Sequence, residues 1–287
     1  MLVRAPAKIN LFLRVLARED SGYHQIETLF TAVNFYDEIQ FQLTTGEISL
    51  RVVGSDLGPI RENLVYRAAT LFFSRMGASK GVDIILQKKI PTESGLGGGS
   101  SDAGATLRTL NFMLGKPFSS SVLMNMAIQL GADVPFFSSG LGAALAWGRG
   151  ERLMPIGFHS HVVLALTSIP VGTAGAYDGL VLSRRTTESG VVPREITSLE
   201  QLATFSSNHF EENVFERYPE LEDLRQSIER VGSPVARLSG SGGTVFGLFR
   251  TADEAHAATN ELSRYWPDIQ FVVAETLDSQ PEPNVLT

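Results

Sequence analysis

The chain has no cysteine among its 287 residues. This absence excludes disulfide bonds, cysteine-ligated metals and a cysteine nucleophile, and it is consistent with a reducing compartment. Basic residues are also scarce relative to acids, with 24 Lys and Arg against 31 Asp and Glu and a net charge of −7. Nucleic acids and anionic membranes need basic faces, so neither is an expected partner.

Long hydrophobic runs are missing from the N-terminus. The first residues, MLVRAPAKINLFLRVL, are interrupted by Arg4, Lys8, Asn10 and Arg14, which makes them too polar for a signal peptide or a membrane span. We therefore expect a cytoplasmic protein. The 43% hydrophobic and 19% charged content is typical of a globular chain long enough for a sizeable core.

Hydrophobic periodicity predicts a mixture of strands and helices. Apolar residues alternate from Ile9 to Val15, as in a strand with one buried face. Further strands are expected at 37–43, 47–53, 81–91 and 161–171. Helices are expected at 62–77, from Ser100 or Ser101 to Gly115, at 119–131 with Ser121 as N-cap, at 218–232, and at 251–266 with a capping box at Thr251 and Glu254.

The order of these elements suits an α+β fold with helices on one face of an antiparallel sheet. A seam near 155–161 divides the chain into an N-terminal domain, 1–157, and a C-terminal domain, 158–287. The polar run SRRTTESGVVPRE (183–195) predicts a mobile loop, and the final residues, QPEPNVLT, are expected to fray.

Glycine is concentrated in one stretch, KKIPTESGLGGGSSDAGATL, residues 88–107. It is not a Walker A loop, because no lysine follows the glycines. It is not a dinucleotide fingerprint either, because Ser100 replaces the last glycine and no acid follows ~20 residues later.

The stretch instead predicts a strand, a glycine loop and the start of a helix, which together form an anion site. The alternative is a surface turn with one capping serine. Asp102 would complement the helix dipole, metal ligation being the minor alternative.

The run PTESGLGGGSSDAGATL resembles the P-x-x-x-G-L-G-x-G-S-S-x-A phosphate loop of the GHMP kinases, named for galactokinase and the homoserine, mevalonate and phosphomevalonate kinases. Two further stretches are similar to that family's N-terminal motif and C-terminal glycine loop: APAKINLFLRV and RLSGSGGTVFGLF. The resemblance runs in order over residues 4–249. One departure is Gly104, where the family usually has alanine; glycine in the first turn of a helix costs up to ~1 kcal/mol.

This resemblance implies a two-domain fold with the active site in the cleft between the domains. The N-terminal domain would be ribosomal-protein-S5-domain-2-like, and the C-terminal domain a ferredoxin-like α/β sandwich. It implies ATP and Mg²⁺, without naming a protein ligand for the metal, and a monomer or homodimer. The implied ATP-binding residues are Asn63 (also readable as a helix N-cap), Lys88, Lys89, Pro91, Gly95, Leu96, Gly97, Gly98, Gly99, Ser100 and Ser101.

Phosphoryl transfer to an alcohol needs a group that orients or deprotonates the hydroxyl. The resemblance assigns Asp133, in GADVPFF, as this catalytic base, although an aspartate after a helix end is often an ordinary turn residue. It places Lys8 beside Asp133, where a cation holds the carboxylate ionised; the usual alternative is a solvated lysine on a strand face. Asn10 shares the face of Lys8 by the period of two and would contact the substrate alcohol.

The combination of PAKINL, GYHQIETLF and GADVPFF is similar to the branch of the family whose alcohol substrate carries a cytidine diphosphate, in the non-mevalonate isoprenoid pathway. Tyr23 and Tyr177 would then stack on the cytosine, His24 would read its edge, and Phe30 would line the pocket. The alternative, without any role in binding, is that both tyrosines are half-buried packing residues.

Three competing functions follow from the same residues. A stacking tyrosine followed by histidine disfavours a GHMP kinase for homoserine or mevalonate, because this pair would have no function with those small substrates. The presence of both Lys8 and Asp133 disfavours a GHMP-like nucleotide sensor, which would bind without turnover. A dinucleotide-dependent oxidoreductase lacks its last glycine and its ribose-binding acid.

Overall fold

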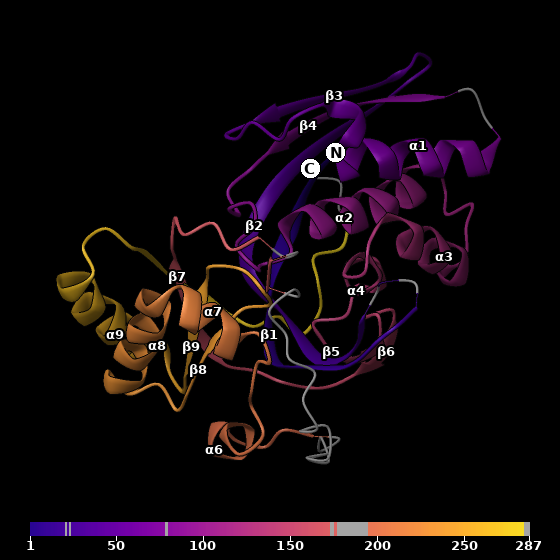
Figure 1. Ribbon diagram of the computed structural model, residues 1–287. Coiled ribbons are helices and arrows are strands. Elements are labelled where there is room, and N and C mark those ends of the chain that lie inside the picture. Colours follow the sequence, from indigo (N-terminus) through magenta and orange to yellow (C-terminus); the bar gives the residue numbers. More distant parts are fainter. Residues whose placement is uncertain (21, 23, 78–79, 173–174, 177–194, 284–287) are drawn as a thin grey trace.

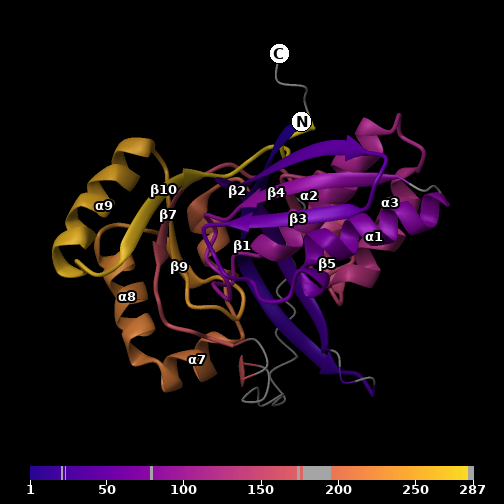
Figure 2. The ribbon, with the colours of Figure 1, turned by 90° about the horizontal axis from the view of Figure 1, so that it is seen from above.

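The computed structural model describes all residues of the chain except 21, 23, 78–79, 173–174, 177–194 and 284–287. Two β-sheets, each with its own helices, lie side by side (Figures 1 and 2). No helix among the described residues combines the length and the apolar character that crossing a membrane requires.

The N-terminal half is built around one long central strand, β2. Along one edge β2 pairs with β1, and along the other edge its first part pairs with β5 and its last part with β4. β3 adds to β4 in parallel and β6 adds to β5. The six strands are β1 (Leu2–Arg18), β2 (His24–Thr44), β3 (Ile48–Val53), β4 (Gly81–Gln87), β5 (Ala143–Gly148) and β6 (Arg152–Pro155).

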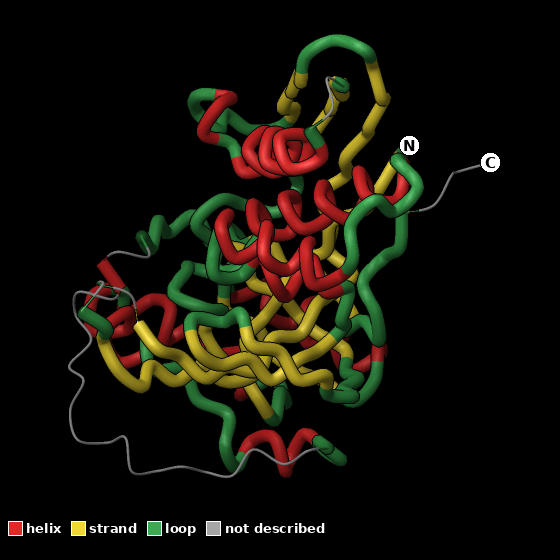
Figure 3. Tube along the Cα trace, turned by 90° about the vertical axis from the view of Figure 1, so that its right-hand side faces the viewer, coloured by secondary structure: helices red, strands yellow, loops and turns green. Residues whose placement is uncertain are grey.

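Helices cover one face of this sheet, as Figures 1 and 3 show. They are η1 (Ile60–Glu62), α1 (Leu64–Met76), α2 (Gly98–Met113), α3 (Ser120–Leu130) and α4 (Val134–Ser139). The predicted cap of α1 is confirmed, because Asn63 Oδ1 accepts a hydrogen bond from the Val65 amide at 2.9 Å. Apolar residues of these helices and of β2–β4 form one core.

The C-terminal half is a four-stranded antiparallel sheet in the order β10-β7-β9-β8. This order and its βαββαβ sequence give the ferredoxin-like sandwich that was predicted. Its elements are β7 (His161–Leu166), α6 (Leu199–Ala203), α7 (Glu211–Arg217), α8 (Pro219–Arg230), β8 (Val235–Leu238), β9 (Val245–Phe249), α9 (Ala252–Tyr265) and β10 (Gln270–Glu275).

The two halves share a hydrophobic core through β7. Val163 and Ala165 face the helices of the C-terminal half, whereas Val162 and Leu164 pack in one cluster with Ile9 and residues of the N-terminal sheet. A strand buried on both faces explains the continuous apolar run of β7. The two halves are therefore packed on each other through a common core.

Several boundaries differ from the prediction. β1 extends well beyond Ile9–Val15, and bulges, one of them between Asn10 and Phe12, interrupt its simple alternation. Residues 24–36, which were not predicted as strand, are continuous with 37–43 in β2. α3 begins at Ser120 with Ser119 as its N-cap, not Ser121.

The C-terminal tail is held in place up to residue 283, contrary to the expected fraying. Gln280 is 2% exposed and donates to the carbonyls of Phe136 at 3.0 Å and Leu141 at 2.8 Å. Arg108 donates to the Pro281 carbonyl at 2.8 Å. The tail thus returns to the N-terminal half, so the division at 157/158 stays a prediction. Most of the polar run 183–195 lies outside the described residues.

Gly104 lies inside α2 rather than in its first turn, and close packing explains it. A Cβ at this position would lie 2.6 Å from the Cβ of Phe137 and 2.9 Å from the Ser138 amide nitrogen. Alanine would therefore push α4 away from α2. The family's usual residue does not fit here without a shift of α4, which carries Asp133 at its start.

Candidate active site

A cavity of about 840 Å³ opens where the N-terminal half meets residues 210 and 240–241 of the C-terminal half. Its size is that of a site for small-molecule ligands. Many predicted site residues lie on its wall: Lys8, Asn10, His24, Phe30, Lys88, Pro91, Gly95, Gly97, Gly98, Gly99, Ser100 and Asp133.

The glycine loop ends in the start of α2, two residues earlier than predicted. Gly97 is the N-cap with φ +70°, and no side chain caps the helix. A Cβ at Gly97 would lie 3.1 Å from both Lys8 Cγ and a Phe137 ring carbon, so packing as well as backbone conformation favours glycine. The first amides of this 16-residue helix therefore face the cavity without a side-chain cap, which is an anion site. A turn capped by a serine is not what forms.

A second glycine loop, 239–243, packs on the first, as the resemblance predicted. Ser239 Oγ donates to the Gly95 carbonyl at 3.0 Å, and the Thr244 amide donates to the Ser94 carbonyl at 3.1 Å. A Cβ on Gly95, whose φ is +80°, would overlap the Ser239 carbonyl oxygen at 1.8 Å. Asn208 Nδ2 holds the second loop by donating to the Gly240 carbonyl at 2.7 Å.

Lys8 is buried beside Asp133, and the alternative of a solvated lysine is wrong. The residue is 3% exposed, and its Nζ lies 3.7 Å from Asp133 Oδ2. Burial lowers the pKa of Lys8, and the charge of Asp133 opposes this shift. An incompletely balanced cation thus stands next to a carboxylate that reaches the cavity.

Asn10 and Thr28 fix the position of the Lys8 ammonium. Lys8 Nζ donates to Asn10 Oδ1 at 2.6 Å, Asn10 Nδ2 donates to Thr28 Oγ1 at 2.8 Å, and Thr28 Oγ1 donates to the Phe12 carbonyl at 2.6 Å. This chain of bonds sets the orientation of the amide, since only its oxygen can accept from an ammonium. Thr28 was not predicted as a site residue, and its pairing from β2 is invisible in the local sequence.

Asp133 ends the short connection that follows α3 and is the N-cap of α4. Pro135 occupies the first turn of this helix, a position that its fixed φ favours. The Asp133 carboxylate makes no capping bond, and its side chain is 29% exposed. It is therefore held by its backbone while its oxygens face Lys8 and the cavity.

Lys88 forms a buried ion triad beneath the glycine loop. Its Nζ contacts Asp37 Oδ2 and lies 2.9 Å from Asp102 Oδ2. Asp37 Oδ1 also accepts from the amides of Lys89 at 2.6 Å and Ile90 at 2.9 Å. Asp102 is thus an ion-pair partner rather than a simple complement to the helix dipole. The triad ties the end of β4 to the first turns of α2.

The charges of the triad act on one another through their pKa values. Burial acts to lower the pKa of Lys88, but the Asp102 and Asp37 charges outweigh it and the pKa is raised. Burial raises the pKa of Asp102 to about 7, against the opposing effect of Lys88. The Lys88 ammonium therefore stays charged and occupied by protein carboxylates.

Comparisons with known proteins agree with this geometry. The model of the GHMP kinases N terminal domain matches residues 63–141, and that of the GHMP kinases C terminal matches 191–268. Two relatives named 4-diphosphocytidyl-2-C-methyl-D-erythritol kinase are each 38% identical. The relative from Syntrophotalea carbinolica covers 90% of this chain and 93% of its own length, and that from Pelotomaculum thermopropionicum covers 96% and 97%. The chain belongs to the GHMP kinase family.

A solved structure extends this similarity to three dimensions. The crystal structure of 4-(cytidine 5'-diphospho)-2C-methyl-D-erythritol kinase superposes with a TM-score of 0.77 at 34% sequence identity. The match covers 96% of this chain and 100% of that one. The two-domain GHMP kinase fold predicted from the motifs is confirmed.

Some predicted ATP-binding residues of this GHMP kinase do not lie on the cavity wall. Lys89 pairs with Glu38 at 3.0 Å near the surface. Leu96 is fully buried and its carbonyl accepts from the Lys8 amide at 2.9 Å. Ser101 is 1% exposed, and Asn63 caps α1. Their contacts with ATP stay predictions, as does that of Lys88.

The cavity wall also carries His24, Phe30 and two arginines that were not predicted, Arg18 and Arg149. Burial, with a contribution from the Arg18 charge, lowers the pKa of His24. The Phe30 ring lies 5.2 Å from that of Phe136 and is 1% exposed. The two predicted stacking tyrosines, at positions 23 and 177, lie outside the described residues.

Proposed function

We propose that this GHMP kinase transfers the γ-phosphoryl group of ATP to the 2-hydroxyl of 4-diphosphocytidyl-2-C-methyl-D-erythritol, a reaction of the non-mevalonate isoprenoid pathway. The observation that carries the proposal is the Lys8–Asp133 pair, which shares one cavity with the uncapped start of α2. The names of relatives that cover most of the chain supply the substrate.

In this mechanism the protein supplies position and charge. The substrate hydroxyl lies against Asp133, which accepts its proton as the oxygen attacks the γ-phosphorus and the bond to the ADP oxygen breaks. Amides at the start of α2 bind the phosphates, and Lys8 stabilises the negative charge on the transferring group. The neighbouring Asn10 keeps the ammonium in place and leaves the Asp133 oxygens to the substrate.

Mg²⁺ fits the donor atoms of this cavity. The carboxylates of Asp133 and Glu93 line its wall, and carboxylate and phosphate oxygens are the ligands that Mg²⁺ prefers. The ion would enter with ATP, held mainly by phosphate oxygens with one of these carboxylates beside it, and would neutralise phosphate charge. Proton transfer, phosphate binding and positioning depend on side chains and amides of the chain itself.

The cavity wall around His24 suits a cytidine diphosphate. The lowered pKa of His24 keeps its ring neutral near pH 7, so one nitrogen donates and the other accepts, as reading a cytosine edge requires. Arg18 on the same wall supplies positive charge that a diphosphate needs, and Arg149 lies there in an ion pair with Glu19. Stacking by Tyr23 and Tyr177, a cytoplasmic location, and a monomeric or dimeric state remain predictions from the sequence.

The test is ADP release by the purified protein with Mg·ATP, offering the cytidyl substrate, mevalonate, homoserine and galactose in parallel, with Asp133→Ala as the control. We expect turnover of the cytidyl substrate alone, and its loss in the variant. Turnover of another alcohol would retain the kinase chemistry and reject the cytidine pocket. ATP binding without turnover of any alcohol would indicate a nucleotide sensor.

A further inference from the structure

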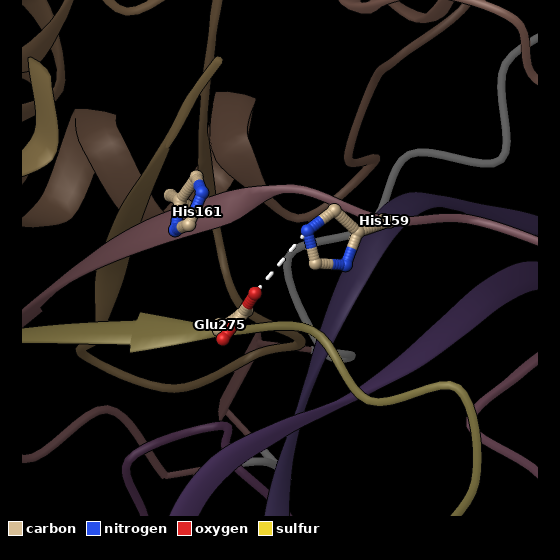
Figure 4. Close-up of side chains that lie close together, drawn as sticks. All are labelled: His159, His161 and Glu275. Atoms are coloured by element: carbon tan, nitrogen blue, oxygen red, sulfur yellow. Dashed lines mark ion pairs between the residues drawn. The ribbon is translucent and has the colours of Figure 1, made fainter. Parts of the chain in front are cut away.

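Three ligand-type side chains meet outside the active site, where β7 and β10 run side by side (Figure 4). His161 and Glu275 are paired across the two strands, so their side chains share one face. His159 precedes His161 by two residues, and its Nε2 lies 3.2 Å from Glu275 Oε1. One ligand atom from each of the three residues lies within 4.8 Å of the others.

We propose that His159, His161 and Glu275 bind one divalent transition-metal ion, with Zn²⁺ preferred. Two imidazoles and one carboxylate are a ligand set that zinc uses, with bonds of about 2.0–2.2 Å and tetrahedral geometry. That geometry separates neighbouring ligand atoms by roughly 3.3 Å, close to the spacing of His159 and Glu275. Small side-chain rotations bring the remaining atoms to this distance, and water completes the coordination.

The backbone that carries the ligands is already fixed. Ser160, between the two histidines, is 3% exposed; its amide donates to Thr276 Oγ1 at 2.9 Å and its carbonyl accepts from the Thr276 amide at 3.0 Å. The Glu275 amide donates to Asn34 Oδ1 at 2.8 Å. His159 is exposed and the other two ligands are partly buried, so an ion reaches a preorganised site without unfolding it.

The position of this cluster suggests what the ion does. It lies at the seam, where the connection from β6 to β7 and the end of β10 meet Asn34 of β2. None of the three ligands lies on the wall of the active-site cavity. A bound ion would link the connection to β10 and stabilise the folded state by mass action. The site is therefore structural and independent of the Mg²⁺ that accompanies ATP.

The experiment is calorimetric titration of the untagged, chelator-treated full-length protein with Zn²⁺, in excess Mg²⁺. We expect saturation at one equivalent, because Mg²⁺ prefers all-oxygen ligands and does not compete. His161→Ala should weaken binding by more than the ~10–100-fold that loss of an outer-shell partner costs. His256→Ala, an exposed histidine on α9, is the matched control and should leave affinity unchanged.

Two further measurements separate a built site from casual binding. Co²⁺ should give the intense visible absorption of a four-coordinate ion in the wild type and not in His161→Ala or Glu275→Gln. Zn²⁺ should raise the melting temperature of the wild type, whereas the metal-free variants should melt like the metal-free wild type and gain nothing. No uptake at one equivalent, displacement by Mg²⁺, or equal uptake by His161→Ala would overturn the proposal.

Discussion

Two buried lysines flank the glycine loop, and their surroundings differ. Lys88 contacts two carboxylates, Asp37 and Asp102, and its pKa is raised. Lys8 has one carboxylate at 3.7 Å and an amide oxygen at 2.6 Å, and burial lowers its pKa. Both side chains are at most 5% exposed, and the two carboxylates beside Lys88 outweigh the effect of its burial whereas the single carboxylate beside Lys8 does not.

The contrast between the two lysines indicates a structural role for Lys88 and a functional role for Lys8. The Lys88 charge is paired with two protein carboxylates, which makes it a link between β4 and α2. The Lys8 charge is incompletely balanced, a condition that costs stability and is retained where a substrate supplies the missing negative charge. We infer that Lys8 serves the reaction and that Lys88 serves the loop.

The largest effect is expected from Asp133→Ala, which removes the carboxylate that Lys8 faces. We expect kcat to fall by about 10²–10⁴-fold, the contribution of a positioned general base, with little change in ATP affinity because the amides at the start of α2 remain. Steady-state ADP release and calorimetric ATP binding measure the two quantities. A kcat within about tenfold of the wild type would mean that Asp133 is not the base.

Lys88→Met tests the structural side of the comparison. It leaves the buried carboxylates of Asp37 and Asp102 without their cation, and breaking a buried pair costs about 3–5 kcal/mol of unfolding free energy. Lys89→Met is the matched control: Lys89 is the next residue, its side chain is 46% exposed, and its surface pair with Glu38 is worth about 0–1 kcal/mol. Urea unfolding measures both, and similar losses in the two variants would contradict the assignment.

Lys8→Met tests the functional side of the comparison: it should lower activity without lowering stability, the opposite of what is expected for Lys88→Met. We expect kcat to fall by about 10²–10³-fold, the cost of losing one group that stabilises the transition state, while stability is kept or raised. The pKa of Lys8 is lowered in the folded state, so its charge disfavours folding until the pH rises through that lowered value. The gain of the variant should therefore be largest near neutral pH and shrink as the pH approaches 10. A variant that unfolds more easily near neutral pH would place Lys8 with the structural lysines.

Local patterns predicted the parts of the fold and site that depend on neighbours in sequence. The order of helices and strands predicted an α+β fold with helices on one face of an antiparallel sheet, and the family resemblance supplied its ferredoxin-like form and, through GADVPFF, Asp133. Ser100 or Ser101 was expected to start α2, because serine caps helices better than glycine does. The helix starts at Gly98 with Gly97 as its N-cap, since Lys8 and Phe137 approach the Gly97 backbone too closely for a side chain.

Contacts between distant residues could not be predicted in this way. Asp37 is 51 positions from Lys88, and neither residue is unusual in its own segment. Thr28 reaches Asn10 only because β1 and β2 pair with bulges that shift their register. Arg18 and Arg149 also come from separate strands or turns, so their shared position on the cavity wall depends on the tertiary fold.

The smallest expected effect concerns the protonation state of Asp102 in the triad with Lys88 and Asp37. Asp102 has a pKa raised to about 7 in the folded protein against 3.8 as its ordinary value. Between these values the folded state holds a proton that the unfolded state has released, so stability falls as the pH rises, by at most ~1.4 kcal/mol per unit for one proton. Asp102→Asn cannot titrate, and Lys88 keeps Asp37 in this variant.

The stability of the wild type minus that of Asp102→Asn should therefore decrease from pH 5 to pH 7 and level off above, as urea unfolding at each pH measures. A difference that instead stayed level from pH 5 to pH 7 would mean that Lys88 holds Asp102 ionised when folded, because both states would then have lost the proton below pH 5. The triad would then carry two negative charges against one positive charge at neutral pH, directly beneath the amides that bind phosphate. In that case the net negative charge of the triad would oppose phosphate binding at the start of α2, and the incomplete balance at Lys8 would matter more for holding ATP.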